Sequence, residues 1–153
     1  MKHSLPAVAA LVLALVLSPS VATADVDDLH PDVEYALESV PGGIAVSDTT
    51  VVWPSLGMVL EAASESAAQR AVGSCATGTY CAYALPNLQG SKLTFTICTN
   101  VSTAALQSVG SIANGRSSGN VRARNSSGAT LATAAAGGSA NVGGGTTNLL
   151  CTL

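Results

Sequence analysis

The chain has 153 residues, a formal net charge of −3 and only 3% aromatic residues, which suits one small domain whose core has few large side chains. Its 6 basic residues are too few for the dense patch that nucleic-acid binding needs, so we expect no nucleic-acid partner. All 9 acidic residues lie before residue 66. Residues 66–153 therefore contain no Asp, Glu or His from which to build a general acid–base pair.

Residues 1–24 have the organisation of a secretory signal peptide. Lys2 and His3 form a short basic start, residues 7–17 are an apolar run, and the small residues at 22–24 fit a cleavage site. The apolar run is far shorter than the ~20 residues that a membrane-spanning helix needs. We therefore expect a secreted, extracellular protein without a membrane span.

Residues 25–72 form an acidic extension ahead of the cysteine-rich part of the chain. Pro31 at a first helical position, followed by apolar residues at helical spacing, predicts a short helix that the Pro-Gly-Gly at 41–43 ends. Residues 44–60 are rich in β-branched side chains and carry two turn signals, which predicts a β-hairpin and a third strand. Trp53 is interpreted as a core residue rather than a ligand platform. Residues 61–72 fit either a helical turn or a solvated linker, and we favour the linker.

Three of the four cysteines lie in a predicted β-hairpin, in which apolar-alternating runs at 79–85 and 92–97 flank a turn. An oxidising environment outside the cell favours two disulfides among the four cysteines, which are Cys75, Cys81, Cys98 and Cys151. Four cysteines allow three pairings, and the sequence alone does not choose among them. Our working hypothesis joins Cys75 to Cys98, which would clamp the hairpin, and Cys81 to Cys151.

The rest of the chain alternates short strand patterns with Gly-rich turns. Residues 118–124 predict a strand with its arginines on the solvated face, and further strands are expected at 129–135 and 149–153. Residues 136–145 are rich in Gly, Ala and Ser, which fits either a turn with small inward side chains or a disordered segment. The repeated short strands favour an all-β sandwich or barrel of Greek keys over residues 73–153.

The chain offers little material for an active site, and we expect neither enzymatic activity nor a cofactor. His30, the only histidine after the signal peptide, is interpreted as a helix-capping or solvent-facing residue rather than a catalytic base. Lys92 could form a dyad with a serine, but one lysine among many serines has no specificity. Zinc is disfavoured because residues 73–153 contain no histidine and their cysteines suit disulfides.

A resemblance to a known family rests on two motifs and the cysteine spacing. Tyr83, Leu88 and Gly90 follow the folded-hairpin pattern of the βγ-crystallin Greek key, aromatic-x4-aromatic-x-Gly, with Leu in the second aromatic position. A later polar loop ending in Ser118 resembles the serine-containing loop of that motif. Together with the cysteines, these motifs resemble secreted bacterial peptidase inhibitors with a βγ-crystallin-like fold, relatives of a streptomycete metalloproteinase inhibitor, over roughly residues 73–125. The resemblance implies a βγ-crystallin-like Greek-key sandwich with a short N-terminal helix-and-strand extension.

Calcium sites of βγ-crystallins use a pair of Asn or Asp residues in this loop, before its serine. In this chain the first of the pair is Ala113, and residues 73–153 contain no carboxylate side chain that could hold a hard cation. The resemblance therefore leaves Asn114 and Ser117 as weak calcium ligands, and we expect no resident metal.

The resemblance further implies that the protein, as a monomer, inhibits an extracellular peptidase by presenting a rigid, disulfide-supported loop. Such a loop loses little entropy on binding. The residues do not identify the inhibitory loop; the candidates are residues 99–103, just beyond Cys98, and residues 113–119. The alternative function is a non-inhibitory structural or ligand-binding module of the cell envelope, with at most weak calcium binding.

Overall fold

A computed structural model describes residues 29–63 and 75–153 of the chain. The predicted signal peptide, most of the predicted linker and the domain boundary at residues 72–73 lie outside these residues. The helices are α1 (Pro31–Ser39) and the short 3-10 helix η2 (Pro54–Leu56). The strands are β1 (Ile44–Ser47), β2 (Thr50–Trp53), β3 (Met58–Glu61), β4 (Tyr80–Leu85), β5 (Gln89–Phe95), β6 (Asn100–Ser102), β7 (Ser111–Asn114), β8 (Asn120–Arg124), β9 (Thr130–Ala135), β10 (Ser139–Asn141) and β11 (Asn148–Thr152).

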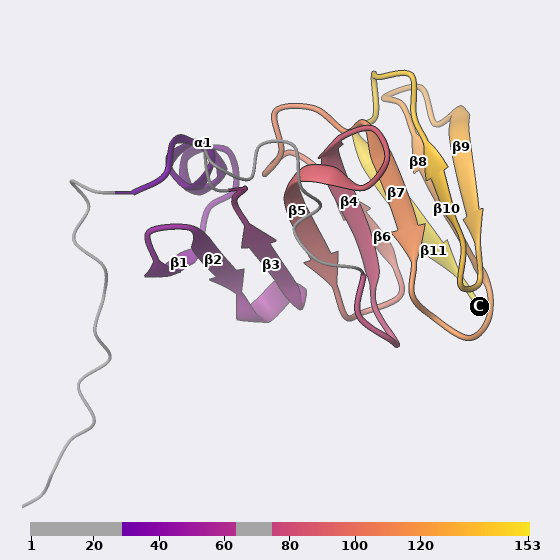
Figure 1. Ribbon diagram of the computed structural model, residues 1–153, viewed down its shortest axis with the longest axis horizontal. Helices are drawn as coiled ribbons and strands as arrows, with labels where there is room; N and C mark the ends of the chain where they lie inside the picture. The colour runs from indigo at the N-terminus through magenta and orange to yellow at the C-terminus, as the bar shows by residue number, and fades with distance from the viewer. Residues whose placement is uncertain (1–28, 64–74) are drawn as a thin grey trace, which may run out of the picture.

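The strands form two antiparallel sheets (Figure 1). The larger sheet has the order β1-β2-β3-β5-β4-β7-β10, and the smaller one has the order β6-β11-β8-β9. Apolar side chains from both sheets meet in one core, whose largest fully buried members include Trp53, Tyr80, Phe95, Leu93 and Leu149. The all-β prediction is confirmed.

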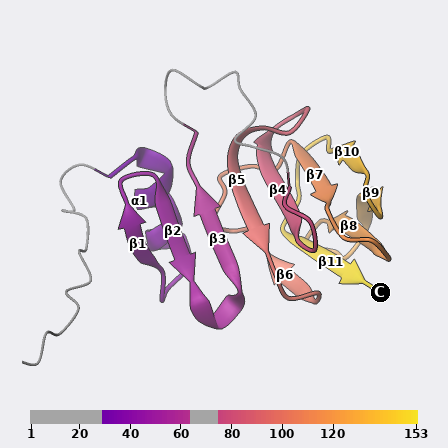
Figure 2. The ribbon, with the colours of Figure 1, turned by 60° about the horizontal axis from the view of Figure 1, so that its bottom comes forward.

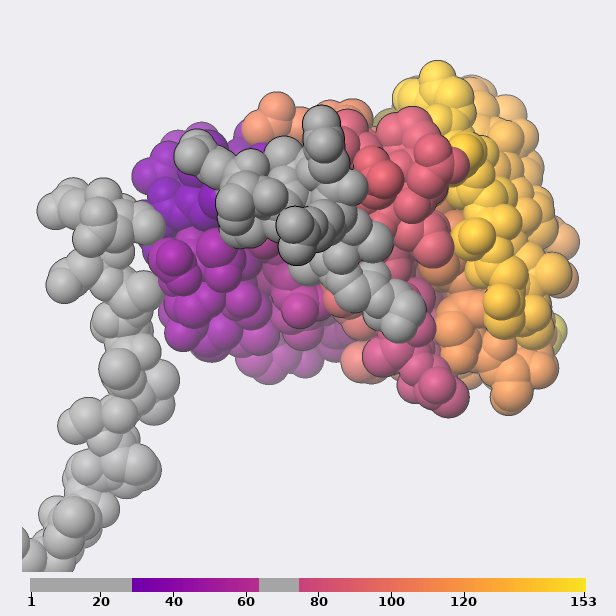
Figure 3. All heavy atoms as spheres, in the orientation of Figure 1, coloured from indigo at the N-terminus to yellow at the C-terminus, as the bar shows by residue number. Residues whose placement is uncertain are grey.

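The strands of the extension belong to the larger sheet. β3 pairs with β5 in a register that places Met58 opposite Phe95 and Leu60 opposite Leu93, so the sheet is continuous from β1 to β10. In the space-filling view of Figure 3, the N-terminal part and the strands that follow Cys75 accordingly form one body.

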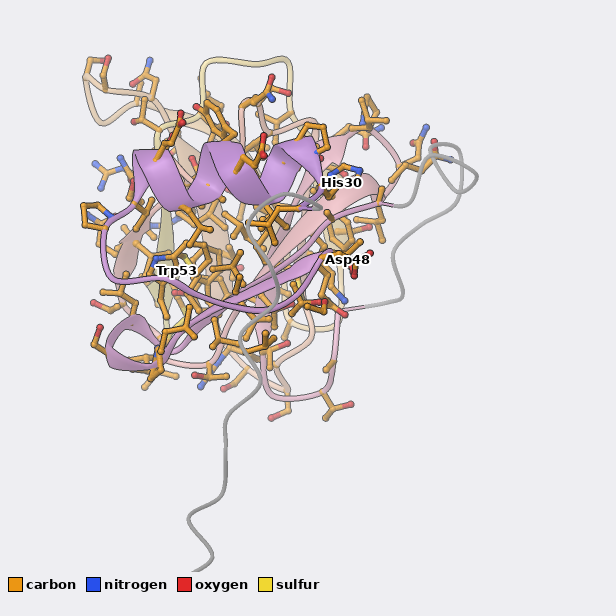
Figure 4. All side chains as sticks on the ribbon, turned by 90° about the vertical axis from the view of Figure 1, so that its left-hand side faces the viewer. His30, Asp48 and Trp53 are labelled. Atoms are coloured by element: carbon orange, nitrogen blue, oxygen red, sulfur yellow. A yellow bond between two sulfur atoms is a disulfide. The ribbon has the colours of Figure 1, made fainter. Side chains whose placement is uncertain are left out.

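Helix α1 covers the part of the larger sheet that the smaller sheet leaves open. Its buried residues Val33 and Ala36 pack into the same core as the strands, and the indole Nε1 of Trp53 donates to the carbonyl of Val40 just beyond the helix (3.0 Å). Figure 4 shows His30 at the start of the helix and Trp53 beneath its other end. Trp53 is 1% exposed, which confirms the prediction of a core residue.

The predicted strands of the hairpins are confirmed, but three short strands were not predicted. β6 and β7 lie in the small, polar stretch after Cys98, and β10 lies in the Gly-rich segment that could have been disordered. These strands have three or four residues each, too few to show a clear alternation of apolar and polar side chains. Two of them form by pairing with longer neighbours, β6 with β11 and β7 with β4, and β10 then pairs with β7.

The disulfides join Cys75 to Cys81 and Cys98 to Cys151, so the hypothesis that paired Cys75 with Cys98 is wrong. Strand alternation explains the difference. Cys81 points to the same outer face of the sheet as Tyr83, and Cys75 packs there. Cys151 lies in the core between the sheets, where Cys98 packs against it. The sheet therefore separates Cys81 from Cys151.

The pairing predicts unequal effects of removing each disulfide. The Cys98–Cys151 bridge closes a separation of 53 residues and the Cys75–Cys81 bridge one of 6. Loop entropy then predicts losses of about 4 and about 2 kcal/mol in the free energy of unfolding for the two double alanine variants. Denaturant titration measures both losses. Peptide mapping of the unreduced protein that found Cys75 joined to Cys98 would contradict the pairing.

Candidate functional site

The hairpin β4–β5 bends sharply at the residues that carry the family resemblance. Leu88 adopts a left-handed backbone (φ 61°), and Gly90 follows with φ 76°. The hydroxyl of Ser111 holds the bend: it accepts a hydrogen bond from the Leu88 N–H (2.9 Å) and donates to the Leu85 carbonyl (2.7 Å). Tyr83, fully buried in β4, lies directly opposite Ser111 in the β4–β7 pairing.

The serine that ties this hairpin is Ser111 of β7. The sequence motif assigned only the serine position of the later polar loop, to Ser118. Ser118 is exposed in the loop between β7 and β8. Ser111 begins β7 and is fully buried. Its role follows from the pairing of β7 with β4, which no local sequence pattern predicts.

The polar loop after β7 uses its asparagine internally. The Asn114 amide nitrogen donates to the carbonyls of Gly119 (3.2 Å) and Ala134 (3.4 Å), and its oxygen accepts from the Arg116 N–H (3.2 Å). Ser117 is exposed, whereas Asn114 is buried. The Asn114 side chain thus orders the loop through both its amide nitrogen and its oxygen.

Residues 96–99, which join β5 to β6 and are called the cross-linked loop below, are held at both ends. The Thr96 N–H donates to the Gly57 carbonyl (2.9 Å), and the Cys151 N–H donates to the Thr99 carbonyl (3.1 Å). The disulfide between Cys98 and Cys151 adds a covalent tie. Within this loop, Ile97 is 51% exposed. An exposed apolar residue thus sits on a loop with little freedom to move.

Tyr80 supports this loop from inside the core. Its hydroxyl lies 2.9 Å from the Ile97 carbonyl and 3.3 Å from the Thr99 carbonyl, to which it can donate, and its ring stacks on Phe95 with centroids 5.1 Å apart. Burial raises the pKa of Tyr80 above its ordinary value of 10.0, although the hydrogen bond to Thr99 opposes the shift. The carbonyls on both sides of Cys98 are therefore turned towards the protein.

A hollow beside the cross-linked loop lies between η2, β6 and Val40, the residue that follows α1. Figure 2 shows the turn between β2 and β3, which contains η2, and β6 towards the lower side of the view. We call this hollow the seam cavity; its volume is about 260 Å³. Its apolar lining consists of Val40, Leu56, Met58, Phe95, Ile97 and Val101. The remaining lining residues, Ser55, Thr99, Asn100 and Ser102, are polar but uncharged.

The charged and nucleophilic residues singled out in the sequence are engaged with one another elsewhere. Lys92 is buried and its Nζ lies 2.6 Å from Glu61 Oε2. The neighbouring Ser91 hydroxyl donates to the Asp32 carboxylate. His30 caps α1, because its Nδ1 accepts from the Asp32 N–H (3.1 Å), which confirms the capping interpretation.

Comparisons with known proteins supply no relative from which to infer a function, so the functional argument rests on these residues. No protein-family model, curated protein or solved structure matches the chain significantly. Within residues 29–63 and 75–153, no three His, Cys, Asp or Glu side chains gather as a metal site. No helix in the same ranges is long and apolar enough to cross a membrane.

Replacing the buried serine should cost far more than replacing the exposed one. Ser111→Ala leaves the Leu88 N–H and the Leu85 carbonyl without their partner, so we expect the free energy of unfolding to fall by about 2–3 kcal/mol. Ser118→Ala is the control and should change it by less than about 0.5 kcal/mol. Denaturant titration of both variants measures the difference. Equal effects would contradict the role of Ser111.

The buried tyrosines predict a loss of stability in alkali. Burial raises the pKa of Tyr80 and of Tyr83, the latter with help from Glu61, above 10.0. As the pH rises past about 10, these tyrosines ionise in the unfolded chain before they ionise in the folded protein. The free energy of unfolding should therefore be constant below that pH and decrease above it. Denaturant titrations between about pH 8 and about pH 11 test this, and Tyr80→Phe should make the decrease shallower. A flat profile in the original protein would contradict it.

Proposed function

We propose that this protein is a secreted peptidase inhibitor that presents the cross-linked loop to its target, with Ile97 as the residue that enters the peptidase. The observation that carries the proposal is the combination at Ile97 of high exposure with a backbone fixed by Tyr80 and by the Cys98–Cys151 disulfide. Ordering the backbone of one residue costs about 1–2 kcal/mol in conformational entropy. In this loop the ordering takes place on folding, so binding does not incur the cost again.

The orientation of the loop carbonyls indicates how the loop would block a peptidase. A substrate-like inhibitor must offer a peptide carbonyl to the catalytic group. The carbonyls of Ile97 and Thr99 instead face Tyr80 inside the protein. The loop would therefore occupy the target's cleft through the Ile97 side chain, and its peptide bonds would stay intact. Neither loop expected from the sequence, residues 99–103 or residues 113–119, contains Ile97, and residues 100–102 form β6. The exposure of Ile97 therefore moves the proposal to residues 96–99.

We also infer the Greek-key arrangement of a βγ-crystallin-like domain for residues 75–153. The support is an exchange of strands between the sheets: β4, β5 and β7 share the larger sheet while β6 lies in the smaller one. In the second half β8, β9 and β11 share the smaller sheet while β10 lies in the larger one. Export from the cell is supported by the two disulfides, which persist in oxidising compartments.

A titration of the mature protein against metallo-, serine and cysteine peptidases tests the inhibitory function. We expect stoichiometric inhibition of at least one class, and Ile97→Asp should weaken it by roughly 30-fold or more, as expected for a central interface residue. Ile44→Asp is the matched control, because Ile44 is exposed to a similar extent (46% against 51%) but lies on β1. It should inhibit like the original protein.

The outcomes separate the candidate functions. Failure to inhibit any of the three classes would overturn the proposal in favour of the non-inhibitory extracellular module. Equal weakening by Ile97→Asp and Ile44→Asp would overturn the role of the cross-linked loop. Mass spectrometry of the inhibitor recovered from the complex should find the chain uncut between residues 96 and 99.

A further inference from the structure

β6 exposes one open edge beside the seam cavity. β6 is an end strand of the smaller sheet and pairs with β11 on one side. The Thr99 carbonyl accepts a hydrogen bond from the Cys151 N–H, and the Thr103 N–H donates to the Thr147 carbonyl. Both groups therefore point towards β11. Because alternate residues of an antiparallel strand point their N–H and C=O groups the same way, those of Asn100 and Ser102 point away from β11. Within the described residues, no strand pairs with this second edge.

The seam cavity lies along the same strand, because Asn100, Val101 and Ser102 all line it. Val101 is half-buried and lines the cavity, with Met58 and Phe95 of the larger sheet also in its wall. A residue of an added strand directly opposite Val101 would point its side chain to the same face of the sheet. The edge and the cavity therefore suit successive parts of one extended ligand.

We propose that β6 and the seam cavity together bind an extended peptide, which adds a strand to β6 and places one large uncharged side chain in the cavity. The main-chain groups of Asn100 and Ser102 would bond the peptide residues that flank this side chain. The proposal does not depend on peptidase inhibition, because the edge and the cavity wall from Met58 and Phe95 exist whether or not Ile97 enters a peptidase.

The lining determines which side chain is accepted. A cavity of about 150 Å³ with an apolar lining is large enough for benzene. The seam cavity, at about 260 Å³, has room for a phenylalanine or leucine side chain. None of its lining residues is charged, so an aspartate or lysine side chain would lose its hydration without gaining an ionic partner. An edge of three residues forms few hydrogen bonds, so the cavity provides the selectivity.

Nuclear magnetic resonance on the mature, disulfide-bonded protein tests the proposal with short acetylated and amidated peptides of serine and threonine. The central residue is phenylalanine, leucine, aspartate or lysine. At about 1 mM, the phenylalanine and leucine peptides should shift the amide signals of Asn100 and Ser102 and the methyl signal of Met58. The charged peptides should not. A phenylalanine peptide with N-methylated residues on both sides of the centre should bind at least about tenfold more weakly.

One variant removes the edge donor while leaving the β11 ladder in place. Ser102→Pro deletes an N–H that points away from β11, a position at which a sheet edge tolerates proline. It should weaken binding of the phenylalanine peptide by at least about tenfold. Ser102→Ala is the control: it keeps the N–H, loses the hydroxyl that accepts from the Ala104 N–H, and should bind normally. If Ser102→Pro does not fold, the N-methylated peptide decides the same point.

Three results would overturn the proposal. The first is the absence of shifts at Asn100, Ser102 and Met58 with every peptide. The second is that the N-methylated peptide binds as tightly as the unmodified phenylalanine peptide, or that toluene alone causes the same signal shifts. Either result would make the cavity a site for small apolar molecules rather than for a strand. The third is equal binding of the aspartate peptide, which would remove the role of the uncharged lining.

Discussion

The pairing of β3 with β5 is the interaction on which both proposed surfaces depend. It makes the N-terminal strands part of the larger sheet and brings Gly57, at the turn before β3, next to the end of β5. The Gly57 carbonyl then accepts from the Thr96 N–H, which fixes the start of the cross-linked loop. A Cβ at Gly57 would lie 2.5 Å from the Thr96 hydroxyl oxygen, and φ is 56°, so the approach requires glycine.

The same pairing creates the seam cavity. Because β1 to β3 extend the sheet beyond the width of the smaller sheet, α1 covers the excess, and the end of α1 and β6 meet only across a hollow. The cavity lies at the junction between the helical extension and the two-sheet domain, next to the loop that the same extension supports.

Polar contacts reinforce the junction between the extension and the strands after Cys75. Glu61 and Lys92 are directly opposite each other in the β3–β5 register, and Asp32 of α1 accepts a hydrogen bond from Ser91 of β5. Two acidic residues of the extension, Asp32 and Glu61, thus meet partners in β5, so part of the charge segregation along the sequence corresponds to contacts across this junction.

Local patterns in the sequence determined the elements that are long or strongly marked: the helix at Pro31, the hairpin of β4 and β5, and the alternation of β8. Tertiary structure decided the rest, because it depends on contacts between segments far apart in the chain. The disulfide partners of Cys81 and Cys98 followed from which face of a sheet each side chain occupies. The role of Ser111 followed from the β4–β7 register. The exposure of Ile97 depended on which segments pack around Cys98. Spacing along one strand shows which residues share a face, but only pairing with distant strands decides what that face meets.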